Sequence, residues 1–361
     1  MGATMTRPDR PAPDSAPEPL AQVAVTRAVH VAVVAAALVA GLVLSLLLAG
    51  GISVGHMLVF GFAAYLALIY TVTRRLEDRR EATNRLMTGV ATGAFILVLF
   101  PIVSVLWTVI ENGAPRFDTT FFTETMRGVV GEGGGGKHAI IGTLIITGVA
   151  AAFSVPIGLM VAIYLVEYGR GRLARWVTTM VDVMTGVPSI VAGLFAYSLF
   201  VLLTGPGHRS GLAGGVALAV LMTPVVIRTS EEMLRLVPNE LREASYALGV
   251  TRWRTVVKVV LPTAAAGVLT GITLAIARVI GETAPLLLVA GLAQDTNLNP
   301  LEGRMTTLPV MAYYGYQSPG LPPEAGYQRG WTAAFVLVMI VAILFVIARL
   351  IAKLLQPKGL R

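Results

Sequence analysis

Long apolar segments recur along the chain and constrain its fold more than any other feature. A helix needs about 20 mostly apolar residues to cross the hydrocarbon of a bilayer. The chain of 361 residues is 55% hydrophobic and 13% charged, whereas soluble domains are about 25% charged. We therefore predict an all-α polytopic membrane protein. Eight segments reach or approach the spanning length: 28–49, 55–73, 87–110, 139–166, 176–203, 212–230, 262–281 and 331–351.

The segments between and around these spans complete the outline. Residues 1–27 contain five prolines and few apolar side chains, so we expect a disordered tail. The stretch 283–293 is apolar but too short to cross alone. We expect a bent continuation of the seventh span or a re-entrant half-helix there. The loops 111–138 and 294–330 are rich in Gly and Pro, and we expect them to be connectors or contact surfaces outside the membrane.

Basic residues are distributed unevenly between the two sides of the predicted bundle. With the N-terminus inside, the inner segments hold 21 of the 28 Lys and Arg residues. Because basic residues collect in cytoplasmic loops, we place both termini in the cytoplasm of a plasma-membrane protein. The chain contains no cysteine and four scattered histidines. This composition offers no pattern for a metal site or for thiol or histidine catalysis.

One predicted cytoplasmic loop, residues 231–262, has the pattern of a short helix. Pro238 ends the preceding helix, and Asn239 is a suitable N-cap. Glu240 and Glu243 fall in the first turns, where the helix dipole favours acids. A small-residue face recurs at helical spacing. It consists of Leu241, Ala244, Ala247 and Leu248.

The end of this helix and the segment after it also follow a pattern. Gly249 is suited to end the helix, because glycine readily adopts a positive φ. A basic stretch with Trp253 follows, and we expect Leu261 and Pro262 to break the helix at the membrane surface. By pattern alone, the helix either lies on anionic lipid or docks onto a partner protein.

A motif in this loop resembles the EAA loop of ABC importer permeases, whose form is E-A-A-x3-G-x9-I-x-L-P. This chain departs from that form at Ser245, in place of Ala, and at Val259, in place of Ile. The resemblance implies a six-span type I permease core with a coupling helix that sits in a groove of a separate ATPase. It assigns ATPase coupling to Glu240, Glu243, Ala244, Ser245, Gly249, Leu261 and Pro262.

Two charged residues stand near the outer end of the seventh predicted span. Arg278 and Glu282 are four residues apart, so we expect them to share one helix face and to pair. Arg278 lies 16 residues beyond Pro262, or roughly 24 Å along a helix. An ionised residue inside a membrane normally faces a cavity or a transport path, and a pair that only fixes helix packing is the alternative. The planar guanidinium of Arg suits a tetrahedral oxyanion.

The string R-x-x-G-E-T-A-P that contains these two residues is similar to the phosphate permeases. The segments GVPSIVAGLF at 186–195 and TPVVIRTSEEMLRLVP at 223–238 agree with that resemblance. Ala284 and Pro285 favour the A-type permease of the bacterial phosphate ABC transporter over its C-type partner.

The resemblance to the phosphate permeases implies a substrate path. It links Arg278 to the passage of phosphate, with Glu282 as the partner of Arg278 and Thr283 in the same string. Arg228 is a further candidate, although it lies near the inner end of its span and is also suited to mark the membrane interface. For Asp182, inside a predicted span, we expect a buried partner rather than a transport role.

The resemblance also sets the expected domains and partners. We expect a tail at 1–27, an accessory hairpin and basic loop at 28–86, and a permease core at 87–361 with a type-1 region at about 139–350. The implied partners are a C-type permease, two copies of an ATPase and an extracytoplasmic phosphate-binding protein, with no nucleic acid. We expect no metal or organic cofactor on this chain, since the partner uses the ATP.

Other functions remain open at this stage. A permease for another oxyanion or a small solute would share the coupling loop. A stand-alone secondary transporter should show paired broken helices in inverted repeats, and only one such break, near 283–293, is visible. An intramembrane enzyme would need a nucleophile and a base, which the spans do not show. The glycine-rich segment 131–138 nearly matches a phosphate-binding loop, but His138 stands where that motif needs a hydroxyl.

Overall fold

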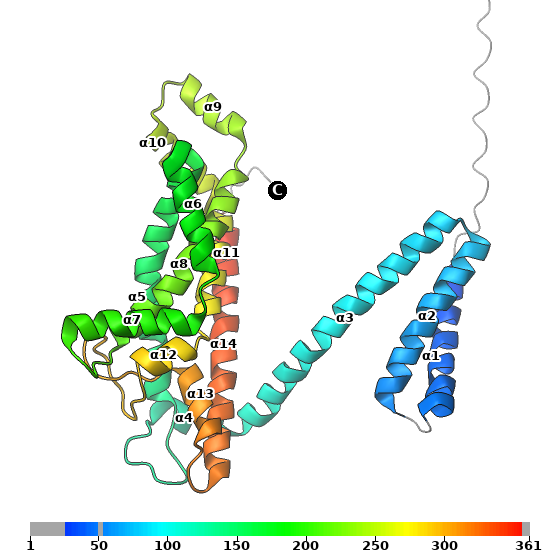
Figure 1. Ribbon diagram of the computed structural model, residues 1–361, viewed down its shortest axis with the longest axis horizontal. Helices are drawn as coiled ribbons and strands as arrows, with labels where there is room; N and C mark the ends of the chain where they lie inside the picture. Colours follow the sequence, from blue (N-terminus) through cyan, green and yellow to red (C-terminus); the bar gives the residue numbers. More distant parts are fainter. Residues whose placement is uncertain (1–25, 50–52, 356–361) are drawn as a thin grey trace, which may run out of the picture. The chain divides into compact units, whose positions relative to one another are not determined.

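Helices form every regular element in the part of the chain that the structure describes. The structure is a computed structural model that describes residues 26–49 and 53–355 (Figure 1). Among these residues, seven helices are long and apolar enough to cross a membrane, and the bent pair α6–α7 is an eighth candidate. The predicted all-α polytopic fold with up to eight spans is therefore confirmed.

The helices follow one another with short connections over most of the chain. In order, they are α1 (Arg27–Ala49), α2 (Val54–Leu76), α3 (Arg79–Gly113), α4 (Thr119–Thr123), α5 (Lys137–Ile163), α6 (Gly171–Thr185), α7 (Ser189–Thr204), α8 (Gly211–Arg235), α9 (Asn239–Ala247), α10 (Arg252–Thr255), α11 (Leu261–Val279), α12 (Ala284–Val289), α13 (Leu308–Gln317) and α14 (Pro323–Leu355). A 3-10 segment follows α3 (η1, Ala114–Arg116), and π-helical segments follow α5 (η2, Tyr164–Tyr168) and α10 (η3, Val256–Val260).

The chain divides within α3 into two compact units, Met1–Val105 and Leu106–Arg361. In the first unit, α1 and α2 form a helical hairpin. The two helices approach closely at Gly41, where an added Cβ would lie 2.7 Å from the Cα of Gly61. This hairpin confirms the predicted pair of extra N-terminal spans. Small residues at a helix crossing allow the two backbones to approach this closely.

Two parts of the predicted domain outline stay predictions. Residues 1–25 of the expected disordered tail lie outside the described residues. The expected domain boundary between residues 86 and 87 falls inside the continuous helix α3. The expected span 87–110 is confirmed as part of that helix.

The second unit is built around α8, which packs against α5, α7 and α11. The Ser154 hydroxyl of α5 donates to the Ala219 carbonyl of α8 at 3.2 Å, so these two helices are joined by a buried hydrogen bond as well as by apolar contacts. Helices α5, α8, α11, α12 and α13 all contribute to the main core. Its buried members are Ile146, Ala150, Leu218, Met222, Val226, Ala275, Val279, Leu286, Ala290, Met305 and Val310.

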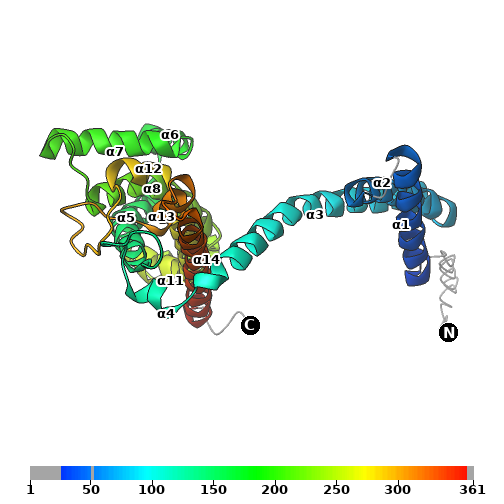
Figure 2. The same cartoon turned by 90° about the horizontal axis from the view of Figure 1, so that it is seen from below.

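The predicted span 176–203 is a bent pair of helices. The chain forms two helices there, α6 and α7, which meet at an angle of 105°. Pro188 stands at the break and lacks a backbone N–H, and the residue before a proline is disfavoured in the α conformation. After the break, α7 packs against α12, and Figure 2 shows α6 and α7 along one side of the second unit.

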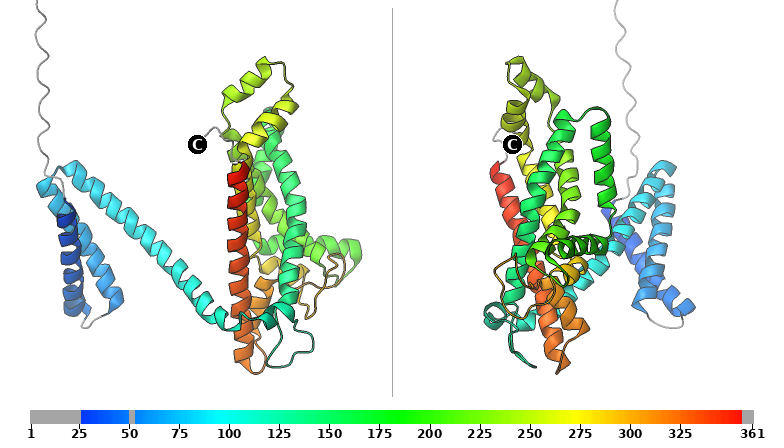
Figure 3. Two further views of the ribbon diagram at one scale, coloured as in Figure 1. Left: turned by 180° about the vertical axis from the view of Figure 1, so that it is seen from behind. Right: turned by 60° about the vertical axis from the view of Figure 1, so that its left-hand side comes forward.

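The two ends of the second unit differ in character. The short helix α9 lies at one end, and α4 and α13 lie at the opposite end (Figures 1 and 3). The expected half-helix in 283–293 is confirmed as α12, six residues long after a break. The loop expected over 294–330 contains α13 and the first turns of α14. The end with α9 carries the candidate coupling residues.

Candidate coupling loop and transport path

Helix α9 ends in a Schellman motif centred on Gly249. The φ of Gly249 is 73°, in the left-handed region that favours glycine. Its N–H donates to the Tyr246 carbonyl at 2.9 Å, and the Val250 N–H donates to the Ser245 carbonyl at 3.2 Å. These are the two hydrogen bonds that define the motif. The predicted role of Gly249 in ending the helix is confirmed.

The start of α9 differs from the prediction. Pro238, not Asn239, occupies the N-cap position, with φ −58° and ψ 141°. Asn239 is already the first helical residue, and its side-chain oxygen accepts from Arg242 Nη1 at 3.3 Å. The fixed φ of proline makes Pro238 the boundary, so the helix begins one residue earlier than the N-cap prediction requires.

The outer surface of α9 is exposed and carries the predicted acids. Glu240, Glu243 and Ala244 are exposed, and neither carboxylate forms an ion pair with any residue that the structure describes. Ser245 differs, because it is buried and its hydroxyl lies 2.8 Å from the Thr255 hydroxyl of α10. Serine at this motif position, in place of alanine, therefore supplies a hydrogen bond inside the loop.

The chain remains helical through Leu261 and Pro262, so the predicted helix break there is wrong. The Leu261 N–H donates to the Val256 carbonyl, which closes a π-helical turn immediately before α11. Pro262 lies in the first turn of α11, where its missing N–H is tolerated by the wider π-helical geometry. Leu261 packs against a second core cluster formed by α5, α8, η3 and α11.

A buried ion pair fastens α9 to the rest of the second unit. Arg242 Nε donates to Glu167 Oε1 at 3.0 Å, although the two residues are 75 positions apart in the chain. The side chain of Glu167 is 4% exposed. The sequence prediction missed both residues. No local spacing signals such a pair, because it depends on how the end of α5 packs beside the loop.

The outer charged residues are arranged differently from the prediction. Helix α11 ends at Val279, so Glu282 lies in the following turn and does not share a helix face with Arg278. The expected ion pair between them is absent from the described residues, and Arg278 is exposed. The Glu282 N–H donates to the Val279 carbonyl at 3.1 Å, and the Thr283 hydroxyl contacts the Gly281 carbonyl at 3.5 Å. The predicted pairing of Arg278 with Glu282 is therefore wrong.

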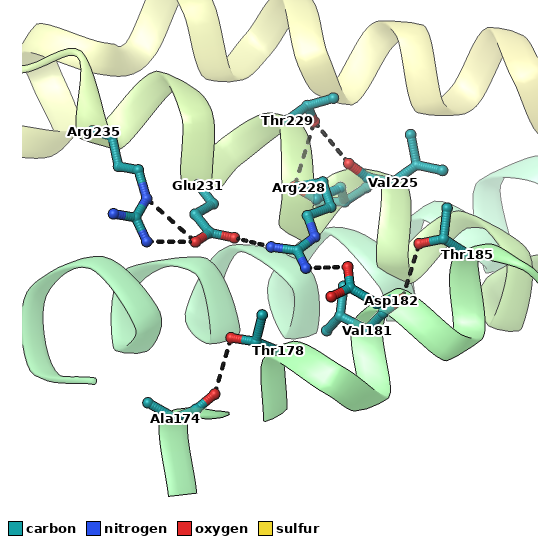
Figure 4. A network of polar contacts seen from close by, with 11 residues as sticks. Ala174, Thr178, Val181, Asp182, Thr185, Val225, Arg228, Thr229, Glu231 and Arg235 are labelled. Carbon is teal, nitrogen blue, oxygen red and sulfur yellow. Dashed lines mark hydrogen bonds and ion pairs between the residues drawn. The ribbon is translucent and has the colours of Figure 1, made fainter. Parts of the chain in front are cut away.

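Arg228 takes part in a network between α6 and α8 (Figure 4). Its Nη1 donates to Glu231 Oε2 at 2.8 Å, and its Nη2 contacts the Asp182 carboxylate of α6. Arg235 contacts the other Glu231 oxygen at 2.8 Å. Glu231 is 8% exposed, whereas Asp182 is 61% exposed. The expected partner of Asp182 is therefore Arg228, and Asp182 itself is not buried.

Arg228 and Arg278 lie at different depths in the bundle. Helices α8 and α11 are antiparallel, since Gly267 lies against Met233 and Gly271 lies against Thr229. By this register, Arg228 is level with position 272 of α11, six residues before Arg278. The two arginines are thus about 9 Å apart along the helix axis. One guanidinium is neutralised by carboxylates, and the other is exposed without an ion pair among the described residues.

The glycine-rich segment 131–138 has a different environment from a phosphate-binding loop. No strand precedes it within the described residues. The Gly134 carbonyl accepts from Arg116 Nη2 at 2.8 Å, and the Gly131 carbonyl accepts from Arg329 Nη1 at 2.8 Å. Its carbonyl oxygens therefore face cations, whereas a phosphate-binding loop presents N–H groups to an anion.

Comparison with known proteins places this arrangement in one family. Residues 154–360 match the family described as "Binding-protein-dependent transport system inner membrane component". A phosphate transport system permease protein PstA 1 of Mycobacterium tuberculosis is 47% identical over 285 residues, which cover 78% of this chain and 92% of the relative. The PstA protein of Pasteurella multocida is 38% identical over 272 residues, covering 75% of this chain and 95% of the relative.

Solved structures agree on the fold. A MetNI methionine ABC transporter in an inward-facing conformation superposes with a TM-score of 0.51 at 24% identity, covering 61% of this chain and 95% of the other. A bacterial alginate ABC transporter gives a TM-score of 0.51 at 13% identity, covering 78% and 98%. Both confirm the ABC importer permease fold. The chain is thus a multi-pass membrane permease of the binding-protein-dependent transport family, and within it belongs with the PstA phosphate transport system permeases.

Proposed function

We propose that this chain is the transmembrane permease subunit of an ATP-driven importer of inorganic phosphate and forms half of its translocation path. The observation that carries the proposal is α9. An EAA-type helix with unpaired acids is exposed at one end of the bundle, in a chain whose relatives at 38–47% identity are phosphate transport permeases. Members of this family are transport permeases rather than enzymes.

A permease of this family works with other ABC transporter components. We infer that the partners here are a C-type permease, two copies of an ATPase that uses the ATP, and an extracytoplasmic phosphate-binding protein. The bias of Lys and Arg toward the inner segments supports cytoplasmic termini. In that orientation α9 faces the cytoplasm, where the ATPase is.

The coupling residues divide into two groups in this proposal. Glu240, Glu243 and Ala244 lie on the exposed surface of α9 and contact the ATPase. The second group shapes the loop. Ser245 supplies a hydrogen bond, Gly249 forms the left-handed turn, and α11 starts at Leu261 and Pro262. Movement of α9 by the ATPase is then a rigid-body displacement of attached spans.

The path residues are assigned by charge and exposure. Arg278 is the exposed cation near the outer end of α11, and its planar donors suit a phosphate oxyanion. Glu282 and Thr283 flank it in the turn before α12. Arg228 lies farther from the outer end of the bundle than Arg278 and is paired with Asp182 and Glu231. An anion must therefore compete with these two carboxylates to bind it.

Reconstitution into liposomes tests the function. The chain with its C-type partner, the ATPase and the phosphate-binding protein should move phosphate only when ATP is supplied. The chain alone should move none. Uptake of phosphate by the chain alone would support a stand-alone transporter instead. Transport of sulfate but not phosphate by the full complex would assign the permease to another oxyanion.

A further inference from the structure

Three segments of the second unit meet at the guanidinium group of Arg242. Its Nε donates to the Glu167 carboxylate at 3.0 Å, its Nη2 to the Leu234 carbonyl at 2.9 Å and its Nη1 to the Val237 carbonyl at 2.5 Å. Glu167 lies in the π-helical end of α5, and the two carbonyls lie at the end of α8. One side chain of α9 therefore contacts the ends of two long helices.

The Arg242–Glu167 pair is shielded from solvent. The two side chains are 12% and 4% exposed. An exposed ion pair exchanges readily with water and restrains little, whereas removing one partner of a buried pair leaves an uncompensated charge. Separation of α9 from α5 is therefore resisted by the cost of leaving the Glu167 carboxylate buried without its partner.

The inner side of α9 carries a second attachment. Ser245, one turn after Arg242, is buried and bonded to Thr255 of α10 at 2.8 Å. Helix α9 is thus joined to α8 and to α10 both by the chain and by side chains. Its link to α5 is different, because Glu167 and Arg242 are separated by 75 positions in the sequence. Helix α9 is not connected to α5 by a short stretch of chain, so the ion pair provides the contact.

We propose that the Arg242–Glu167 ion pair is the joint that transmits movement of α9 to α5. The proposal rests on the coupling role of α9 given above. When the ATPase displaces α9, the chain itself pulls on α8 and, through α10, on α11. The ion pair connects α9 to α5 as well, and α5 packs along α8 through Ser154 and the main core. Helices α5, α8 and α11 then move as one body. Without the pair, part of the displacement is absorbed between α9 and α5.

Glu167→Gln in the full complex tests this joint. The substitution keeps the size of the side chain and leaves the bonds from Arg242 to the α8 carbonyls in place. We expect the ATPase to co-purify in normal amounts and to hydrolyse ATP, while phosphate moved per ATP falls about 5-fold or more, the usual scale of a coupling effect. Arg242→Lys, which keeps the charge but loses the planar set of donors, should give a smaller fall.

Glu77→Gln is the matched control. Glu77 pairs with Arg85 at the same distance, 3.0 Å, and is 9% exposed, but it lies in the first unit. Its substitution should leave phosphate moved per ATP unchanged. A normal ratio in Glu167→Gln would overturn the proposal, and so would loss of ATPase co-purification, which would make Glu167 a folding or docking residue.

A distance measurement makes the test independent of activity. The chain contains no cysteine, so spin labels can be attached to single cysteines at Tyr246 of α9 and Met160 of α5, both exposed. ATP binding should leave their separation unchanged in the wild type and increase it in Glu167→Gln. An equal increase of this separation in the wild type and in Glu167→Gln would overturn the proposal that the ion pair transmits movement from α9 to α5. If the wild-type complex hydrolyses ATP but moves no phosphate, the proposed function fails. The spin-label distances then still test whether the ion pair transmits movement of α9 to α5.

Discussion

Gly249 shows how one backbone conformation shapes the coupling loop. Its φ of 73° closes the Schellman motif at the end of α9, and an added Cβ would meet no atom within 4 Å. Space is therefore available for a side chain. The restriction at this position is conformational, since a left-handed backbone costs a residue other than glycine about 1–2 kcal/mol.

Gly249→Leu should weaken docking of the ATPase while leaving membrane insertion intact. The new side chain disfavours the left-handed turn that ends α9. Co-purification of the ATPase with the permease, compared at equal membrane levels, measures the effect. Gly249→Asn is the control, because asparagine tolerates the left-handed region, and docking should be largely retained. Unchanged co-purification of Gly249→Leu would contradict the coupling role of α9.

Arg278→Ala should lower phosphate uptake by about 10- to 100-fold, the loss expected for a charged hydrogen-bond donor worth about 1.5–3 kcal/mol. Arg278 is exposed and has no ion pair among the described residues, so its removal leaves no buried carboxylate behind. Uptake by cells of the variant strain is the measurement, with membrane levels of the complex as its control. Normal uptake would remove Arg278 from the substrate path. Arg278→Lys should retain part of the activity, since it keeps the charge.

Among the elements, α6 is joined to α8 by the network around Arg228. Glu231 is buried and accepts from two arginines, whereas Asp182 is 61% exposed and contacts one. Glu231→Ala should therefore lower the free energy of unfolding by about 1–3 kcal/mol, because Arg228 loses its buried acceptor and keeps only the exposed Asp182. Asp182→Asn should cost about 1 kcal/mol or less, since solvent can replace its contact.

Thermal unfolding of the purified variants in one detergent compares these two substitutions. The Glu231 variant should unfold at a clearly lower temperature than the Asp182 variant, and Thr178→Val on the same face of α6 serves as a control outside the ion pairs. If the Asp182 variant were the less stable of the two, the contact with α6 rather than the buried Glu231 would hold the network together.

The elements also show where sequence patterns suffice and where they do not. Apolar length located the spans because the bilayer imposes it, and the turn at Gly249 followed from local backbone chemistry. The span 176–203 was predicted from its apolar length, which gave no sign of the bend between α6 and α7 at Pro188. Apolar content alone does not report the direction of a helix.

The candidate site was predictable only in part, for a related reason. The motif positions Glu243 and Gly249 could be recognised because they belong to one short segment. The contacts of Arg228 with Asp182 and of Arg242 with Glu167 join residues 46 and 75 positions apart. Such pairs depend on the packing of α8 against α6 and α5. No periodicity within a single helix contains that information.

For the whole molecule, the length shared with relatives is shorter than the chain. The relative at 47% identity is matched over 92% of its length, whereas about a fifth of this chain lies outside the match. The family region at 154–360 falls entirely in the second unit. The end of α3 belongs to that unit as well, since the Thr332 hydroxyl donates to the Gly113 carbonyl at 2.9 Å.

Deletion of residues 2–76 should therefore leave a working permease. It removes α1 and α2 together, so the number of remaining spans stays even, and Arg79 and Arg80 at the new N-terminus still favour the cytoplasm. Phosphate uptake at equal membrane levels should stay close to that of the full chain. Deletion of residues 2–116 also removes α3 with its contacts to α14, and it should abolish uptake. Loss of uptake in the shorter deletion, with the complex still assembled, would make the hairpin part of the transport machinery.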